Sequence, residues 1–201
     1  MTPKALYEWK KILSFWFGNN IFESKERSRK WFVKDNTFDE LIKNNFFEIL
    51  EIAMDGKLID WSKFPESSLA LIILLDQFSR NIFRNSKKAF SQDKLSLKYA
   101  LDALDNEFDK FISWEKKFFF YLPLEHSEDK ELVEKSVSYI TQWKNEAPTI
   151  YSKDAEKFLY FTQKHLEVIK KFGRYPHRNK ILKRISTKEE LIFLQTPGSS
   201  F

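Results

Sequence analysis

The chain has 201 residues, enough for one domain with a large core. Aromatic residues make up 17% of it, which excludes an intrinsically disordered protein, and the absence of cysteine excludes disulfides and cysteine–zinc sites. The net charge of +5 comes mostly from lysines spread along the chain, so nucleic acid is not expected as a partner. No signal peptide and no apolar run of about 18–20 residues is present, which predicts a soluble cytoplasmic protein without membrane contact.

An all-α fold is expected for the whole chain. No sustained alternation of apolar and polar residues indicates strands, and the four glycines leave no room for a glycine-rich phosphate loop. The sequence therefore predicts about nine or ten helices stacked as antiparallel neighbours, in a single domain over 1–201, and no cofactor. In chain order the helices are expected over 3–17, 24–34, 37–54, 65–83, 92–108, 113–123, 127–143, 152–172, 177–184 and 187–196.

Local signals set several of these boundaries. Thr37 with Glu40, and Thr187 with Glu190, have the spacing of a capping box. Ser127 is expected to N-cap the helix that follows it. Pro123 is expected to end the helix over 113–123. Three glycines stand in the position that follows the last turn of a helix: Gly18, Gly56 and Gly173.

The helix expected over 65–83 organises the rest of the chain. Its first half contains seven consecutive apolar residues, Leu69 to Leu75, which is typical of a helix buried on all sides. Its second half carries Asp76, Gln77, Arg80 and Arg84, and the spacing of Asp76, Arg80 and Arg84 places them on one polar stripe. One interpretation is an ion pair that neutralises itself near the core. The other is that Arg80 binds a carboxylate or phosphate while Asp76 orients it.

A second polar stretch is Glu125 to Glu128. Capping and the helix dipole explain Ser127 and the acidic residues, but they leave His126 unexplained. A histidine beside the free N–H groups of a helix start suits anion binding or proton transfer. His165 follows Phe161 by four residues on the expected inward face of its helix, so it is interpreted first as a core residue that could also line the bottom of a pocket.

The third stretch is the basic turn 173–179. Gly173 and Pro176 frame it, and they restrict the geometry of Arg174, His177 and Arg178. A basic surface loop would not need such a frame. We therefore include all three side chains among the candidate site residues.

These stretches also carry a resemblance to a known family. LDQFSRNIFR (75–84), FFYLPLEHSED (119–129) and FGRYPHRN (172–179), together with Trp31-Phe32 and Phe38-Asp39, resemble the bacterial domain of unknown function 924 family. The chain departs from the family at Ser79, where proline is usual. The resemblance implies a tetratricopeptide-like, right-handed helical array and no established activity. Trp31 is also included among the candidate ligand-binding residues.

The leading functional hypothesis is a pocket for a small anionic molecule. Four arginines would bind a carboxylate or phosphate: Arg80, Arg84, Arg174 and Arg178. Gln77, His165 and Trp31 are expected to help bind the same ligand. His126 and His177 would exchange protons, and Asp76 or Glu125 would orient them. If the protein is an enzyme, hydrolysis or another acid–base reaction suits these groups.

Three alternatives remain open. A helical stack can instead act as a scaffold that binds a protein or peptide on a concave face. His126 and His177 with a carboxylate are suitable metal ligands, but no His-x-x-x-His or Glu-x-x-His pair occurs and nearby arginines repel cations, so no metal is expected. The basic stretch 170–184 is the one region where nucleic acid could bind. The sequence does not indicate an oligomeric state.

Overall fold

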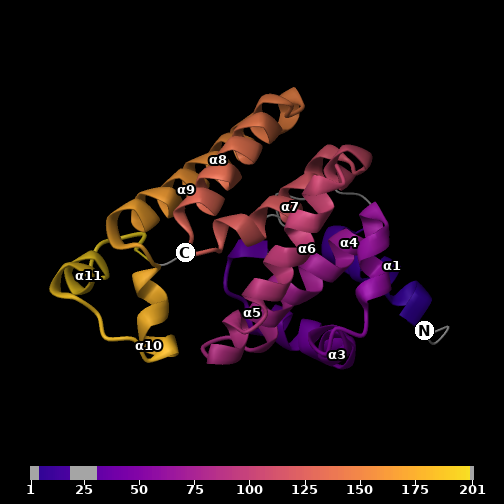
Figure 1. The fold of residues 1–201 in the computed structure, drawn as a ribbon, viewed down its shortest axis with the longest axis horizontal. Helices are drawn as coiled ribbons and strands as arrows, with labels where there is room; N and C mark the ends of the chain where they lie inside the picture. The colour runs from indigo at the N-terminus through magenta and orange to yellow at the C-terminus, as the bar shows by residue number, and fades with distance from the viewer. Residues whose placement is uncertain (1–4, 19–30, 200–201) are drawn as a thin grey trace. The chain divides into compact units, whose positions relative to one another are not determined.

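The computed structural model describes residues 5–18 and 31–199. These residues form helices and short 3-10 turns without any strand, which confirms the all-α expectation (Figure 1). The α-helices are α1 (Ala5–Phe17), α3 (Asn36–Met54), α4 (Pro65–Ile73), α5 (Ser79–Ile82), α6 (Asp93–Asp105), α7 (Trp114–Glu125), α8 (Lys130–Asn145), α9 (Ser152–Phe172), α10 (Asn179–Leu182) and α11 (Lys188–Phe193). Most of the helix expected over 24–34 lies outside the described residues, and the tetratricopeptide-like arrangement stays a prediction.

The contacts between residues divide the chain into two compact units. The first holds the described residues up to Arg84 together with Lys88–Pro123, and the second holds Asn85–Lys87 with the described residues from Leu124 onward. Each unit is described by itself. The single domain expected over 1–201 stays a prediction.

The first unit is built around one continuous helix, in which a π-helical turn (Leu74–Phe78) joins α4 to α5. Every residue from Ser67 to Ser79 is buried, which confirms the expected buried central helix. The helices α1 and α6 pack against α4, and α3 packs against the π turn and α5. A π turn holds one more residue than an α turn, so it changes the direction of the side chains that follow it.

Trp31 belongs to the aromatic core of the first unit. Its indole Nε1 donates a hydrogen bond to the backbone carbonyl of Trp16 at 3.1 Å. The ring stacks on that of Trp16, with a centroid distance of 6.1 Å, and meets Phe119 edge-on at 5.0 Å. These contacts account for the tryptophan through packing.

The second unit is a helical hairpin followed by short helices. The helices α8 and α9 lie side by side, as Figure 1 shows, and α10 and α11 follow them in the chain. The core of this unit contains apolar side chains from both long helices together with Tyr175: Val133, Val168 and Ile169, with Leu166, Phe172 and Phe193 packed around them. His165 is buried as expected, whereas Phe161, expected on the same inward face, is 51% exposed.

Two predicted N-caps are wrong by two residues. The side chain of Asp35, and not that of Thr37, accepts hydrogen bonds from the first turn of α3. Asp129, and not Ser127, does the same for α8, while the hydroxyl of Ser127 accepts a hydrogen bond from the backbone of Asp129. In both cases a carboxylate two residues away from the expected cap accepts two backbone N–H groups, and its charge also complements the helix dipole.

Pro123 does not end α7 but lies inside it, two residues before the helix finishes at Glu125. Proline removes one helical hydrogen bond and usually disfavours a helix interior. Here Pro123 and the residues around it are buried, from Phe118 to Glu125. Packing of this segment therefore outweighs the local preference. The capping box of Thr187 and Glu190, by contrast, is confirmed at the start of α11.

Gly173 ends α9 in the left-handed conformation, with φ at 66°, and its N–H donates to the carbonyl of Ile169. No atom lies within 4 Å of where a Cβ would stand, so a side chain there costs only backbone strain. We expect Gly173→Ala to lower the free energy of unfolding by about 1 kcal/mol. Gly173→Asn should cost less, because asparagine tolerates this conformation, and chemical denaturation of both variants measures the difference. Equal losses would show that strain at this φ is not the cause.

Candidate functional site

The polar end of the central helix forms an internal network in the first unit. The carboxylate of Asp76 is 1% exposed and accepts a hydrogen bond of 2.6 Å from the side-chain amide of Gln77. Arg80 lies 3.3 Å from the same carboxylate and also donates to the backbone carbonyl of Asp76. Its guanidinium forms a two-pronged pair with Asp93, at 2.8 and 3.1 Å, and lies over the ring of Phe90.

Arg84 is bound in a similar way by α3. Its Nε and Nη2 donate to the two carboxylate oxygens of Asp39 at 2.5 and 2.7 Å, and Asn81 donates to the same carboxylate at 2.8 Å. The hydrogen bond to Asp39 raises the pKa of Arg84, so its charge is firmly retained. The predicted stripe Asp76–Arg80–Arg84 therefore connects the central helix to α3 and α6.

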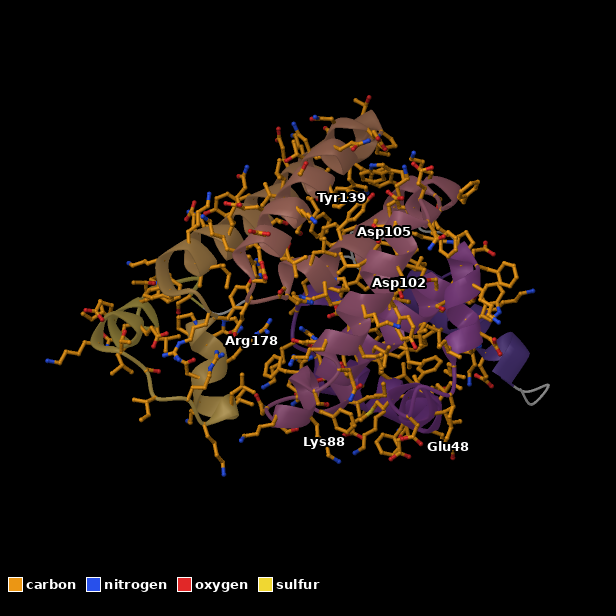
Figure 2. The ribbon with its side chains drawn as sticks, in the orientation of Figure 1. Glu48, Lys88, Asp102, Asp105, Tyr139 and Arg178 are labelled. Atoms are coloured by element: carbon orange, nitrogen blue, oxygen red, sulfur yellow. The ribbon has the colours of Figure 1, made fainter. Side chains whose placement is uncertain are left out.

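A separate polar cluster surrounds Tyr175 in the second unit. The ring of Tyr175 meets the imidazole of His165 edge-on, with centroids 5.5 Å apart. The imidazole of His177 lies tilted to the same ring, with centroids 5.7 Å apart. On the same ring lies the guanidinium of Arg178, 4.6 Å from the centroid. The hydroxyl of Tyr175 donates to the backbone carbonyl of Glu125. We call Glu125, His126, His165, His177 and Arg178, with this ring, the Tyr175 cluster; Figure 2 shows the side chain of Arg178.

The Tyr175 cluster places its charged groups at different depths. Glu125, His165 and Arg178 are 5–7% exposed, whereas His126 and His177 are partly exposed. Burial, together with the positive charge of Arg178, lowers the pKa of His177 to about 3. Burial also lowers the pKa of His165, against the opposing effect of Glu125. Both histidines are therefore neutral at pH 7, each with one N–H donor and one acceptor.

The residues around this cluster are held by two carboxylates. Glu128 accepts a two-pronged pair from Arg184, at 2.6 and 2.9 Å, and a hydrogen bond from the backbone N–H of Tyr175. Burial raises the pKa of Glu128, but these hydrogen bonds outweigh it and the net pKa is lowered. Glu190 accepts both prongs of Arg174, at 2.6 and 2.8 Å, with further hydrogen bonds from Asn179 and the backbone of Thr187.

The eleven predicted site residues thus fall into two groups. Trp31, Asp76, Gln77, Arg80 and Arg84 lie in the first unit, and the other six lie in the second: Glu125, His126, His165, Arg174, His177 and Arg178. In the second unit, the Tyr175 cluster brings together all of these except Arg174, which pairs with Glu190.

Sequence reasoning missed the partners that organise these residues. Asp39, Asp93 and Glu190 bind three of the four arginines that were expected to bind a ligand, and Tyr175 contacts His165, His177 and Arg178 in the second cluster. Each carboxylate is separated from its arginine by 13 to 45 residues, and no local pattern links them. The only available signal was the presence of Asp39 and Tyr175 within the family-like motifs.

Two further observations concern the described part of the chain. Among residues 5–18 and 31–199, no group of three or more histidine, aspartate or glutamate side chains is placed to hold a metal ion. Over the same ranges, each helix is too short or too polar to span a bilayer. The cytoplasmic location stays a prediction.

Comparison with known proteins identifies the family. The model of a family described as bacterial protein of unknown function (DUF924) matches residues 12–198. The chain belongs to this family. A solved structure of a protein of unknown function from Agrobacterium tumefaciens is similar to it, with 32% identity and a TM-score of 0.78 over 95% of this chain and 98% of the other. A comparison with curated proteins finds no match. The resemblance found in the three motifs is therefore confirmed, and the chain shares its fold with the Agrobacterium tumefaciens protein.

Proposed function

We propose that the protein binds a small anionic molecule, a carboxylate or a phosphate, at the Tyr175 cluster. The observation that supports this proposal is a buried guanidinium, that of Arg178, stacked on a tyrosine ring among three histidines. A buried arginine presents a rigid fork of donors that matches the geometry of a carboxylate or phosphate. Burial also strengthens its attraction for a negative charge.

The histidines give the proposed site its acid–base capacity. His126 and His177 are the partly exposed members of the cluster, so they are the ones that a molecule from solvent reaches first. Neutral His177 offers one hydrogen-bond donor and one acceptor, and it lies on the same tyrosine ring as Arg178. If turnover follows binding, the reaction is an acid–base reaction such as hydrolysis, with His126 and His177 as proton carriers. A bound anion would then raise the pKa of His177, because it offsets the charge of Arg178 that lowers this pKa.

The other predicted arginines have a different part in this proposal. Arg80, Arg84 and Arg174 already bind Asp93, Asp39 and Glu190 through two prongs each. Their guanidinium groups therefore hold helices together within each unit, and the proposal assigns the ligand to Arg178 because of its place over the Tyr175 ring. Asp76 and Gln77 belong to the same structural network, and Trp31 to the aromatic core.

Replacement of Arg178 tests the proposal. A set of small carboxylates and phosphates is screened against the full chain by thermal shift, and those that bind are titrated by calorimetry. We expect Arg178→Ala to weaken binding by about 10- to 100-fold, because one two-pronged, charge-assisted interaction is lost. The affinity of Arg178→Lys should lie between those of the wild-type chain and Arg178→Ala, because lysine keeps the positive charge but lacks the planar fork of donors.

Lys180→Ala provides the matched control, because Lys180 is an exposed cation two residues away on α10. It should leave binding unchanged. The proposal is wrong if Arg178→Ala binds as tightly as the wild-type chain.

A second candidate function is a scaffold for a protein or peptide. The observation in its favour is a group of exposed apolar side chains at α11 and just before it: Ile185, Leu191 and Ile192 are 91%, 52% and 66% exposed. The screen with small anions separates the two functions, because a scaffold of this kind would bind none of them through Arg178.

A further inference from the structure

Glu125 differs from the other buried carboxylates of the described chain. Its side chain is 6% exposed, and its Oε2 atom has no hydrogen-bond partner among the described residues. Glu190, which is equally buried, accepts hydrogen bonds from Arg174, Asn179 and a backbone N–H. Buried polar atoms are nearly always paired, so an exception of this kind requires a specific explanation.

The neighbouring histidine does not supply the missing donor. Nδ1 of His165 lies 2.9 Å from the carbonyl oxygen of Phe161 and 3.3 Å from Oε1 of Glu125. Because a carbonyl can only accept, the proton of His165 sits on Nδ1 and is directed chiefly to Phe161. The longer contact reaches only Oε1. The second oxygen of Glu125 is therefore an acceptor that this pair leaves unused.

The position of Glu125 is fixed by the cluster around it. Its backbone carbonyl accepts the hydroxyl of Tyr175, whose ring carries Arg178. The charges of Glu125 and Arg178 both act on the pKa of His165, with opposite signs. The cluster thus combines a strong acceptor with a strong donor fork, both buried. A ligand that satisfies both must carry a donor as well as an anionic group.

We infer that the anionic ligand also carries a hydroxyl or amino group that donates to Oε2 of Glu125. This inference rests on the anion site proposed at Arg178. The ligand class is then a hydroxy or amino acid, or a phosphate ester with a neighbouring hydroxyl, and not a simple carboxylate. A hydrogen bond to a buried charged acceptor is one of the stronger kinds, so the added donor should improve affinity about tenfold or more.

Matched probes test this inference. Propionate is compared with lactate and alanine, and propyl phosphate with glycerol phosphate, by titration of the full chain followed by calorimetry or NMR. Within each series the members share a size and an anionic group and differ in the donor. We expect the donor-bearing members to bind about tenfold tighter. The series that shows the preference identifies the ligand as a carboxylate or a phosphate.

Glu125→Gln removes the acceptor without changing the shape of the side chain. In this variant the amide oxygen faces Nδ1–H of His165, so the amide NH₂ takes the place of Oε2. The NH₂ group is a donor and therefore cannot accept a hydrogen bond from a donor on the ligand. We expect the tenfold preference to disappear in this variant. Glu134→Gln, on the exposed side of α8, is the control and should keep the preference. If Glu125→Gln does not fold, as judged by circular dichroism, the wild-type comparison of the probes decides alone.

The outcomes are distinct. Equal affinity for propionate, lactate and alanine, and for the two phosphates, would overturn the inference and leave the anion site at Arg178 standing. A preference that persists in Glu125→Gln would also overturn it. If none of the probes binds the wild-type chain, or if Arg178→Ala binds them all unchanged, the proposed function itself is wrong and the inference falls with it.

Discussion

Replacing Asp76 with alanine is expected to lower the free energy of unfolding by about 3 kcal/mol. The carboxylate of Asp76 is almost completely buried, and its removal takes an acceptor from the amide of Gln77 and a carboxylate from Arg80, which keeps its pair with Asp93. Because Arg80 keeps its ion pair with Asp93, the loss of stability should be smaller than the loss caused by leaving a buried arginine without any carboxylate partner. Chemical denaturation followed by circular dichroism measures the change.

Asp102→Ala is the matched control for this experiment. Asp102 lies on the exposed side of α6, and its ion pair with Lys98 has a distance of 3.8 Å. Exposed pairs of this kind contribute about 0–1 kcal/mol. An Asp76→Ala variant that keeps the stability of the Asp102→Ala control but loses ligand binding would contradict the structural role. Such a result would return Asp76 to the candidate site.

Glu190→Gln is expected to destabilise the protein by about 2 kcal/mol at pH 7. The hydrogen bonds from Arg174 hold the pKa of Glu190 at about 2, against an ordinary value of 4.5. A depression of this size corresponds to about 3 kcal/mol, and partial exposure of Arg174 reduces it through solvent screening. Denaturation curves of the variant and the wild-type chain give the difference.

The same pKa fixes the direction of the pH dependence. A carboxyl whose folded-state pKa is depressed stabilises the protein above its unfolded pKa, and that stabilisation is lost as the pH falls. The contribution of Glu190 should therefore be complete above about pH 5 and decline between pH 4.5 and about 2. In Glu190→Gln the decline from this group should be absent. Glu189→Gln, at the exposed neighbouring position, should retain it; identical acid curves for all three proteins would contradict the assignment.

The central helix could be read from the sequence because its signal is local. Seven apolar residues in succession leave no polar face, so burial on all sides follows directly. The π turn at Leu74–Phe78 could not be read in the same way. It lies where buried apolar residues give way to buried polar ones, and it packs against α3 and α6, which are distant from it in sequence.

Helix starts were predictable in kind but not in position. At both α3 and α8, two residues capable of capping lie close together, a hydroxyl and a carboxylate. Residue type alone does not decide between them, because the choice depends on which backbone N–H groups each can reach in the folded loop. At α11 there is no such competition, and the predicted cap at Thr187 is confirmed.

The candidate site was predictable only as a set of motifs. Three stretches were selected because charged or titratable groups combine with aromatic residues in them, and the structure brings residues of two of these stretches together around Tyr175. Which arginine binds a carboxylate of the protein itself could not be read. Arg80, for example, pairs with Asp93, thirteen residues further along the chain, and no local pattern in the sequence indicates that partner.

The Tyr175 ring has a consequence for how this region can be studied by mutation. One side chain contacts His165, His177 and Arg178, and its hydroxyl holds the end of α7 at Glu125. Residues that share a partner in this way couple energetically, so the effects of single replacements do not sum. Double-mutant cycles that include Tyr175→Phe are the appropriate way to divide the contributions, because this change removes the hydroxyl and leaves the ring. For the same reason, we expect a substitution at one of these positions to change which substitutions the others tolerate.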